Sequence, residues 1–203
     1  MTRQAIIVDT ETTGLDPARH EIWEIGAIWR NTGVNHLWRM KPDLAAAEPQ
    51  ALAVGRYYER TARMCRRCQP DRVRDLAILE DDDDAEWSSP AALAADMARL
   101  LDGATLIAAN PAFDAGFLAA FLRLHGEAPT WHYRLRDIGS MAWGWLQAHH
   151  LPHHLPIPAM DANTDDLARA MGIEPDGFER HSALGDCRLV AAMLNVIESG
   201  DAS

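Results

Sequence analysis

The chain has 203 residues and a formal net charge of −11 at pH 7. This length suits a single domain that buries its own core, and the negative charge argues against a protein that coats duplex nucleic acid through bulk electrostatics. The three cysteines give no disulfide framework, no apolar run is long enough to span a bilayer, and the first residues lead into a strand without a secretory pattern. We therefore expect a soluble, cytoplasmic protein with no membrane partner.

The first predicted element is an apolar, β-branched strand that ends in acidic residues. Ile6, Ile7 and Val8 are followed by D-T-E-T-T-G, which contains Asp9 and Glu11. Because alternate side chains of a strand project from one face, these two carboxylates lie side by side. At that spacing each raises the pKa of the other unless a cation lies between them, and a hard divalent ion is the natural occupant. The same pattern also fits a buried strand that ends in a solvated acidic turn.

Two more strands and a short helix are predicted next. Residues 21–29 and 34–40 have strand-like patterns and are joined by a tight N-T-G turn. Together with the first strand they predict an antiparallel meander. An alanine-rich stretch at residues 44–54 predicts a short helix that ends at Gly55.

An insertion of uneven charge is predicted at about residues 56–88. Its arginines lie beside Tyr57 and Tyr58, and an acidic run follows at residues 80–84. Arginines with aromatic residues are typical of surfaces that track a single-stranded backbone. The alternative is an exposed helix whose arginines pair with the nearby acids. The arginines are Arg56, Arg60, Arg63, Arg66, Arg67, Arg72 and Arg74.

A helix and a buried strand follow the insertion. Ser89 as the N-cap and Pro90 at the first helical position predict a helix that extends to about Leu101. The continuous apolar run at residues 104–109 predicts a short strand of the buried parallel type.

The next helix carries a carboxylate on its apolar face. The same capping logic places its start at Asn110 and Pro111, and Asp114 shares a stripe with Phe117 and Leu118. A carboxylate on a core-facing stripe is hydrogen-bonded to helix N–H groups or binds a ligand, because an unpaired buried charge is unfavourable. Taken alone, Asp114 is a capping residue. Together with the acidic strand it becomes a third candidate metal ligand.

A fifth strand is predicted at residues 131–137 and an amphipathic helix at residues 138–146. The following stretch, residues 149–156, contains four histidines. Its prolines forbid a helix and its spacing matches no zinc pattern, so it predicts a connecting loop. Thr164 is expected to cap a helix that continues to Ala170.

The last predicted helix has a second carboxylate on its core face. It follows H-S-A-L-G-D with Ser182 as the N-cap, and Asp186 shares a stripe with Val190 and Met193. His181 precedes Asp186 by five residues and is placed in the loop, at the rim of any site.

Four carboxylates and one histidine thus come from one strand end and two helix starts, which meet at one edge of an α/β sheet. The ordered set D-T-E-T-T-G, N-P-A-F-D and H-S-A-L-G-D resembles the DEDDh 3′→5′ exonucleases, the family of polymerase proofreading subunits, ribonuclease T and oligoribonuclease. The resemblance implies an α/β, ribonuclease H-like fold with a five-stranded mixed sheet, three antiparallel strands and then two parallel ones, flanked by helices. We expect one exonuclease domain over residues 1–203 with the insertion at about 56–88.

The resemblance also implies a two-metal mechanism with Mg²⁺ or Mn²⁺, in which His181 is the general base. Hard ions take oxygen ligands, and the motifs assign this role to Asp9, Glu11, Asp114 and Asp186. The terminal nucleotide is assigned to Thr12, Gly14, Leu15, Asn110 and Phe113. Phe113 fits a plain core position equally well.

The expected activity is removal of 5′-mononucleotides from single-stranded DNA 3′ ends, with a DNA polymerase as a candidate partner. One alternative is the same chemistry on RNA, as in ribonuclease T or oligoribonuclease, because discrimination depends on 2′-hydroxyl contacts that no motif reveals. The other is a non-catalytic, polymerase-docking or nucleic-acid-binding module. The intact set of five site residues argues against it.

Overall fold

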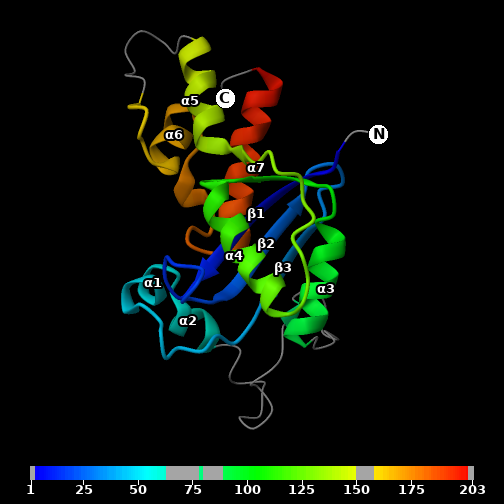
Figure 1. The fold of residues 1–203 in the computed structure, drawn as a ribbon. Coiled ribbons are helices and arrows are strands. Elements are labelled where there is room, and N and C mark those ends of the chain that lie inside the picture. Colours follow the sequence, from blue (N-terminus) through cyan, green and yellow to red (C-terminus); the bar gives the residue numbers. More distant parts are fainter. Residues whose placement is uncertain (1–2, 63–77, 80–88, 150–157, 201–203) are drawn as a thin grey trace.

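The computed structural model describes residues 3–62, 78–79, 89–149 and 158–200. Its centre is one mixed sheet with helices on both faces (Figure 1). The order of the strands across the sheet is β4-β3-β2-β1-β5-β6. The strands are β1 (Ala5–Thr12), β2 (Ile22–Trp29), β3 (Asn35–Arg39), β4 (Ile78–Leu79), β5 (Thr105–Ala108) and β6 (Arg136–Asp137).

The pairing of the strands confirms the predicted ribonuclease H-like sheet. β2 pairs antiparallel with both β1 and β3, whereas β5 runs parallel to β1, and β6 runs parallel to β5. The two-residue β4 adds a short antiparallel strand beside β3, in a stretch where sequence alone predicted only an insertion.

The fifth predicted strand is shorter than expected. Only Arg136 and Asp137 pair with β5, although the prediction began at Trp131. Trp131 and Leu135 instead pack against the hydrophobic core that includes the buried residues of α3 and α4. Before β6, the backbone of Thr130 and His132 bonds to Gly103 and Ala104, ahead of β5, so the ladder with β5 itself begins only at Arg136.

Seven α-helices and one 3₁₀ helix lie within the described residues. The α-helices are α1 (Pro49–Val54), α2 (Tyr57–Ala62), α3 (Pro90–Leu100), α4 (Pro111–Leu124), α5 (Ile138–Ala148), α6 (Thr164–Ala170) and α7 (Ala183–Ser199). The 3₁₀ helix η2 spans Pro175–Gly177. None of the helices in these described ranges has the length and hydropathy needed to cross a membrane.

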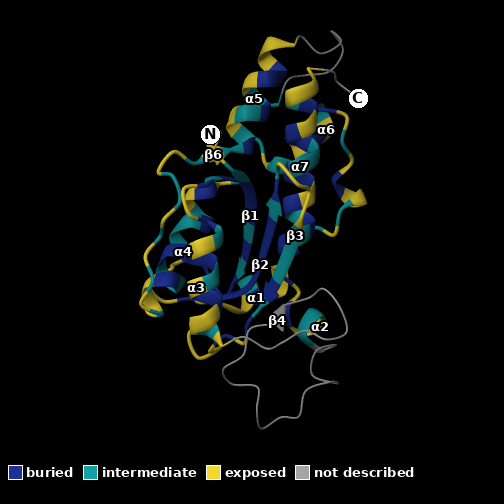
Figure 2. Cartoon of the chain, turned by 90° about the vertical axis from the view of Figure 1, so that its right-hand side faces the viewer, coloured by how far each residue is buried: buried dark blue, intermediate teal, exposed yellow. Residues whose placement is uncertain are grey.

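Alternation along β1 divides the core into two layers. Ile6 and Val8 pack with α3 and α4 on one face of the sheet, whereas Ile7 packs with α5, α6 and α7 on the other. In Figure 2 much of the central sheet and parts of the helices beside it are coloured as buried. Because Asp9 and Glu11 share the parity of Ile7, they project toward the face that α7 covers.

Two of the predicted side-chain caps are confirmed, and one predicted helix is shorter than expected. The side chains of Ser89 and Ser182 cap α3 and α7 as predicted, accepting N–H bonds from Ala92 and Gly185. The predicted short helix at residues 44–54 forms only as α1, because Pro49 fixes its first turn.

Asn110 does not cap α4 with its side chain. It has a left-handed φ of 66° and makes no side-chain capping bond, although Pro111 starts the helix as expected. The cap of α6 is Asn163 rather than Thr164, because the side-chain Oδ1 of Asn163 accepts from Asp166 N at 2.8 Å. An oxygen three residues before the accepted N–H has the reach that the N-cap position requires.

Candidate metal centre

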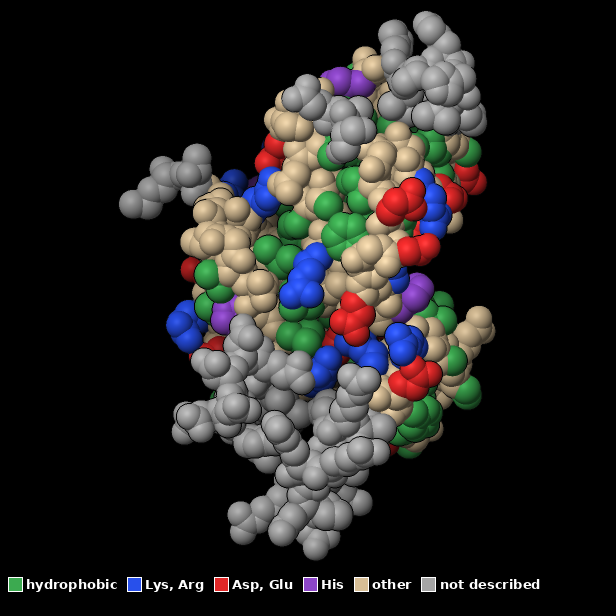
Figure 3. Space-filling view, turned by 180° about the vertical axis from the view of Figure 1, so that it is seen from behind, with side chains coloured by type: hydrophobic (Ala, Val, Ile, Leu, Met, Phe, Trp, Pro, Cys, Tyr) green, Lys and Arg blue, Asp and Glu red, His purple; other side chains and the backbone are tan. Residues whose placement is uncertain are grey.

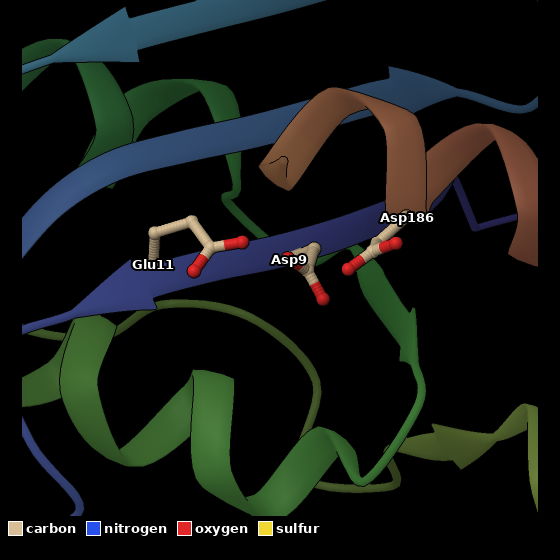
Figure 4. Close-up of side chains that lie close together, drawn as sticks. All are labelled: Asp9, Glu11 and Asp186. Carbon is tan, nitrogen blue, oxygen red and sulfur yellow. The ribbon is translucent and has the colours of Figure 1, made fainter. Parts of the chain in front are cut away.

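Three carboxylates form one cluster beside the end of β1. Asp9 and Glu11 come from one face of β1, and Asp186 comes from the first turn of α7 (Figure 4). One oxygen from each lies within 4.8 Å of the others. Carboxylate oxygens at such spacing are a donor set that suits Mg²⁺ or Mn²⁺. The residues present therefore fit a hard divalent cation.

The fourth predicted ligand, Asp114, lies next to this cluster but outside it. Asp114 is in the first turn of α4, is 2% exposed, and accepts a hydrogen bond from Thr10 Oγ1 at 2.8 Å. Thr10 lies between the two acidic residues of β1 and points to the opposite face, toward α4. Through Thr10, β1 thus connects the buried Asp114 carboxylate of α4 with the cluster on the side of α7.

Burial raises the pKa of each of these strand and α4 carboxylates. The pKa of Asp9 lies well above its ordinary value of 3.8, first because of burial and then because of the charges of Asp114 and Glu11. Burial, followed by the charge of Glu24, raises the pKa of Glu11 from 4.5 to about 7. Burial raises that of Asp114 from 3.8 to about 7, although the bond from Thr10 opposes the shift. A divalent cation at the cluster would favour the charged forms and displace these protons.

The guanidinium groups of Arg60 and Arg180 both offset negative charge near Glu11, and Arg180 also contacts the cluster directly. Arg180 forms an ion pair through Nη1 with Asp186 Oδ1, and its Nε and Nη2 lie 3.0 and 2.7 Å from Asp165 Oδ1. The charge of Arg180 lowers the pKa of both Asp9 and Glu11. Sequence reasoning missed Arg180, and its position directly before His181 was the only signal.

A second missed residue, Glu24, fixes the start of α7 to the sheet. Glu24 is fully buried on β2, opposite Glu11 in the strand register. Its carboxylate accepts from Arg39 Nε at 2.6 Å and from Ala183 N at 2.9 Å, and it also pairs with Arg60. A lone acidic residue within the apolar run W-E-I-G-A-I was the signal for this role.

Arg60 extends this network to the histidine. Its Nη1 donates to the carbonyl oxygen of His181 at 3.1 Å, and its guanidinium lies 5.1 Å from the centre of the Trp23 ring. His181 itself is exposed and has a left-handed φ of 58°, so its backbone is held in a conformation that few non-glycine residues adopt. The turn before α7 is therefore tied to β2 through charged groups.

The two described arginines of the insertion make ion pairs with acids outside the acidic run. Arg56 Nη2 lies 2.7 Å from Glu59 Oε2, and Arg60 pairs with Glu24. Figure 3 shows basic and acidic side chains next to one another on one face of the molecule. The other five arginines, the acidic run and residues 150–157 of the histidine-proline stretch lie outside the described residues.

Three of the residues predicted to contact the nucleotide lie at the end of β1 and in the turn after it. Thr12 Oγ1 donates to the carbonyl oxygen of Gly14 at 2.7 Å, and a Cβ on Gly14 would lie 2.6 Å from the ring of His20. This packing allows only glycine there without a shift of the buried His20. The turn exposes 73% of Leu15.

The other two predicted nucleotide contacts lie on α4. Asn110 is exposed at the helix start, and its N–H donates to Asp137 Oδ1 at 3.3 Å. Phe113 is half-buried and packs against Phe117 with ring centres 4.8 Å apart. Phe113 thus has both a core contact and an accessible edge.

The mixed sheet and its two helical layers place the chain in the ribonuclease H-like class of folds. It is similar to the E. coli exonuclease I in a zinc-bound complex with single-stranded DNA, with 20% identity and a TM-score of 0.67 over 98% of this chain and 41% of that chain. The complex of E. coli exonuclease I with a dT13 oligonucleotide gives 19% identity and a TM-score of 0.65, with 98% and 41% covered. A product-bound exonuclease I gives 17% and 0.64, with 98% and 44% covered.

The chain spans less than half the length of these exonuclease I chains. No family model matches the sequence, and no curated protein matches it. Structural similarity at such low identity establishes the fold.

Proposed function

We propose that the protein is a metal-dependent 3′→5′ exonuclease that hydrolyses phosphodiester bonds at single-stranded DNA 3′ ends and releases 5′-mononucleotides. The observation that supports this most is the approach of Asp9, Glu11 and Asp186 oxygens to within 4.8 Å on a ribonuclease H-like sheet. A solvated acidic turn would not require a third carboxylate from a helix more than 170 positions along the chain.

In this proposal the three clustered carboxylates hold divalent cations, and Asp114 completes the ligand set from α4. When bound, the cations activate water and offset charge on the scissile phosphate. Asp9, Glu11 and Asp186 orient the cations through oxygen ligands, which hard ions prefer. Burial and mutual repulsion raise the pKa of Asp9 and of Glu11, and a cation between the two carboxylates would offset that repulsion.

His181 takes the proton from the attacking water in this proposal. It is exposed at the start of α7, five residues before the ligand Asp186, and a general base must reach the substrate side of a site. The contact of Arg60 with the His181 carbonyl oxygen holds the backbone and leaves the imidazole free.

The terminal nucleotide lies against the turn Thr12, Gly14 and Leu15, with Asn110 and Phe113 beside the sugar. The 73% exposed Leu15 on a turn fixed by hydrogen bonds supplies an apolar surface for a base. DNA is preferred over RNA here because the similar exonuclease I structures contain single-stranded DNA. The intact carboxylate cluster argues against a purely non-catalytic binding module.

The test is a cleavage assay with three 5′-labelled substrates and Mg²⁺: single-stranded DNA, duplex DNA with a mismatched 3′ end, and RNA of the same sequence. We expect the single-stranded DNA to shorten stepwise from its 3′ end, with mononucleotides as products. Faster degradation of the RNA would indicate an exoribonuclease instead. Immediate loss of the label as a mononucleotide would mean attack from the 5′ end and would contradict the proposal.

A further inference from the structure

The guanidinium of Arg180 bridges two carboxylates, only one of which belongs to the candidate metal centre. Nη1 pairs with Asp186 Oδ1, whereas Nε and Nη2 both face Asp165 Oδ1 on α6. The Arg180 and Asp186 side chains are 20% and 16% exposed. The group is therefore partly shielded from water at the point where a metal ligand is needed.

This cation offsets the charge of the cluster only in part. Asp9, Glu11 and Asp186 form the cluster, and Arg180 pairs with only one of these three carboxylates. Arg39 and Arg60 both pair with Glu24, although the charge of Arg60 also acts on Glu11. The cluster thus has room for a further cation while the Asp186 carboxylate already has a partner.

Resting on the proposed function, we propose that Arg180 competes with the divalent cation for Asp186. The guanidinium holds the Asp186 carboxylate beside Asp9 and Glu11. A bound cation would replace Arg180 as the partner of this carboxylate, and Arg180 would keep its two contacts with Asp165 on α6. Arg180 is thus a positioning residue that sets the metal concentration at which the site fills.

The geometry of arginine suits this exchange. A guanidinium presents several N–H donors in a fixed plane, so it can give up one carboxylate and keep another. Two like charges cannot share one carboxylate oxygen closely without repulsion, so the ion pair and the metal bond disfavour each other. Removing the guanidinium should therefore make metal binding tighter, whereas removing an ordinary structural residue would weaken it.

The experiment measures Mn²⁺ binding to the full chain by calorimetry, without substrate. We expect Arg180→Gln to lower the Kd for Mn²⁺ by about tenfold, a coupling typical of linked sites. The matched control is Arg188→Gln, which removes the same charge from an exposed position two residues after Asp186 on α7. Its Kd should stay within about twofold of the unaltered protein, because a solvated charge is largely screened.

A second measurement keeps the test informative if the substitution destabilises the variant. In chelator, Arg180→Gln should melt at a lower temperature than the unaltered protein, and Mn²⁺ should raise its melting temperature by a larger amount. Arg180→Lys keeps the charge but not the planar fork, so it should bind Mn²⁺ at least about threefold tighter than the unaltered protein.

The outcomes separate the two proposals. Unchanged or weaker Mn²⁺ binding by both Arg180 variants, with normal binding by the unaltered protein, would overturn the competition and leave the nuclease proposal standing. Absence of Mn²⁺ binding by the unaltered protein would overturn the proposed function and the competition together. Equal tightening in Arg188→Gln would replace the competition with a general electrostatic effect.

Discussion

At the scale of single residues, buried carboxylates dominate the chemistry of this protein. Burial raises the pKa of Glu11 and of Asp114 to about 7 and moves that of Asp9 in the same direction. Such residues weaken a fold unless they serve another purpose, because the charged form loses its hydration. Their position around one point favours cation binding as that purpose.

The pH dependence of stability should reveal these groups. Between an unfolded pKa near 4.5 and a folded pKa of about 7, Glu11 binds more protons in the folded state than in the unfolded state. Stability must then fall as the pH rises through this window. In chelator, we expect the free energy of unfolding to drop by at least about 2 kcal/mol between about pH 5 and about pH 8.

Urea titrations at several pH values measure this change. Mg²⁺ should restore much of the lost stability at the upper end of the window, and Glu11→Gln should flatten the slope because it removes one of the titrating groups. A metal-free protein that becomes more stable toward alkaline pH would contradict the assignment of raised pKa values.

His181 has a separate expected signature. If it accepts the proton of the attacking water, His181→Ala should lower turnover by roughly 10²–10⁴-fold. Affinity for metal and for substrate should change little, because neither depends on the imidazole in this account. Calorimetry with Mn²⁺ beside single-turnover kinetics distinguishes the roles, and a large loss of Mn²⁺ affinity would make His181 a ligand instead of a base.

At the scale of elements, β2 positions the start of α7. Glu24 accepts the Ala183 N–H, and two residues later Gly26 leaves room for the Ala183 backbone. Residues 24 and 26 both face α7, because alternate residues of a strand project from the same face. This contact sets where Asp186 lies relative to β1.

A methyl group on Gly26 should disturb the site from a distance. An added Cβ would lie 2.5 Å from the carbonyl carbon of Ala183, which is rigid backbone, so α7 must shift. We expect Gly26→Ala to cost about 1–3 kcal/mol of stability and to weaken Mn²⁺ binding. The measurements are urea unfolding and calorimetry.

Gly144 on α5 is the matched control, because an added Cβ there meets nothing within 4 Å. Gly144→Ala should be neutral or stabilising by up to about 1 kcal/mol, with unchanged Mn²⁺ affinity. Equal effects at both positions would rule out a specific role for the contact between β2 and α7.

At the scale of the whole molecule, local patterns predicted the sheet better than the charge network. The apolar runs of β1 and β5 depend on neighbouring residues, so the mixed sheet follows from sequence. The short length of β6 does not, because strand pairing depends on contacts between residues that lie far apart in the chain.

The same distinction applies to the site. Asp9, Glu11 and Asp186 stand in motifs with a recognisable order, and the structure brings their oxygens together. Glu24 and Arg60 are 36 positions apart in the sequence. Arg180, in the turn before α7, pairs with Asp165 on α6. Such pairs depend on tertiary contacts that neither spacing nor periodicity encodes. The Asn-Pro pattern predicted a side-chain cap on α4, but Asn110 has a left-handed backbone and makes no such bond.

The most direct test of the account is Mg²⁺-dependent degradation of 5′-labelled single-stranded DNA by the unaltered protein, Asp9→Asn and Asp186→Asn. Both substitutions keep side-chain volume and remove one ligand charge, and circular dichroism checks that the fold is retained. We expect stepwise 3′ shortening by the unaltered protein, none in chelator, and loss of nearly all turnover in both variants. Near-normal turnover by either folded variant, or full activity in excess chelator, would contradict the carboxylate cluster as the catalytic centre.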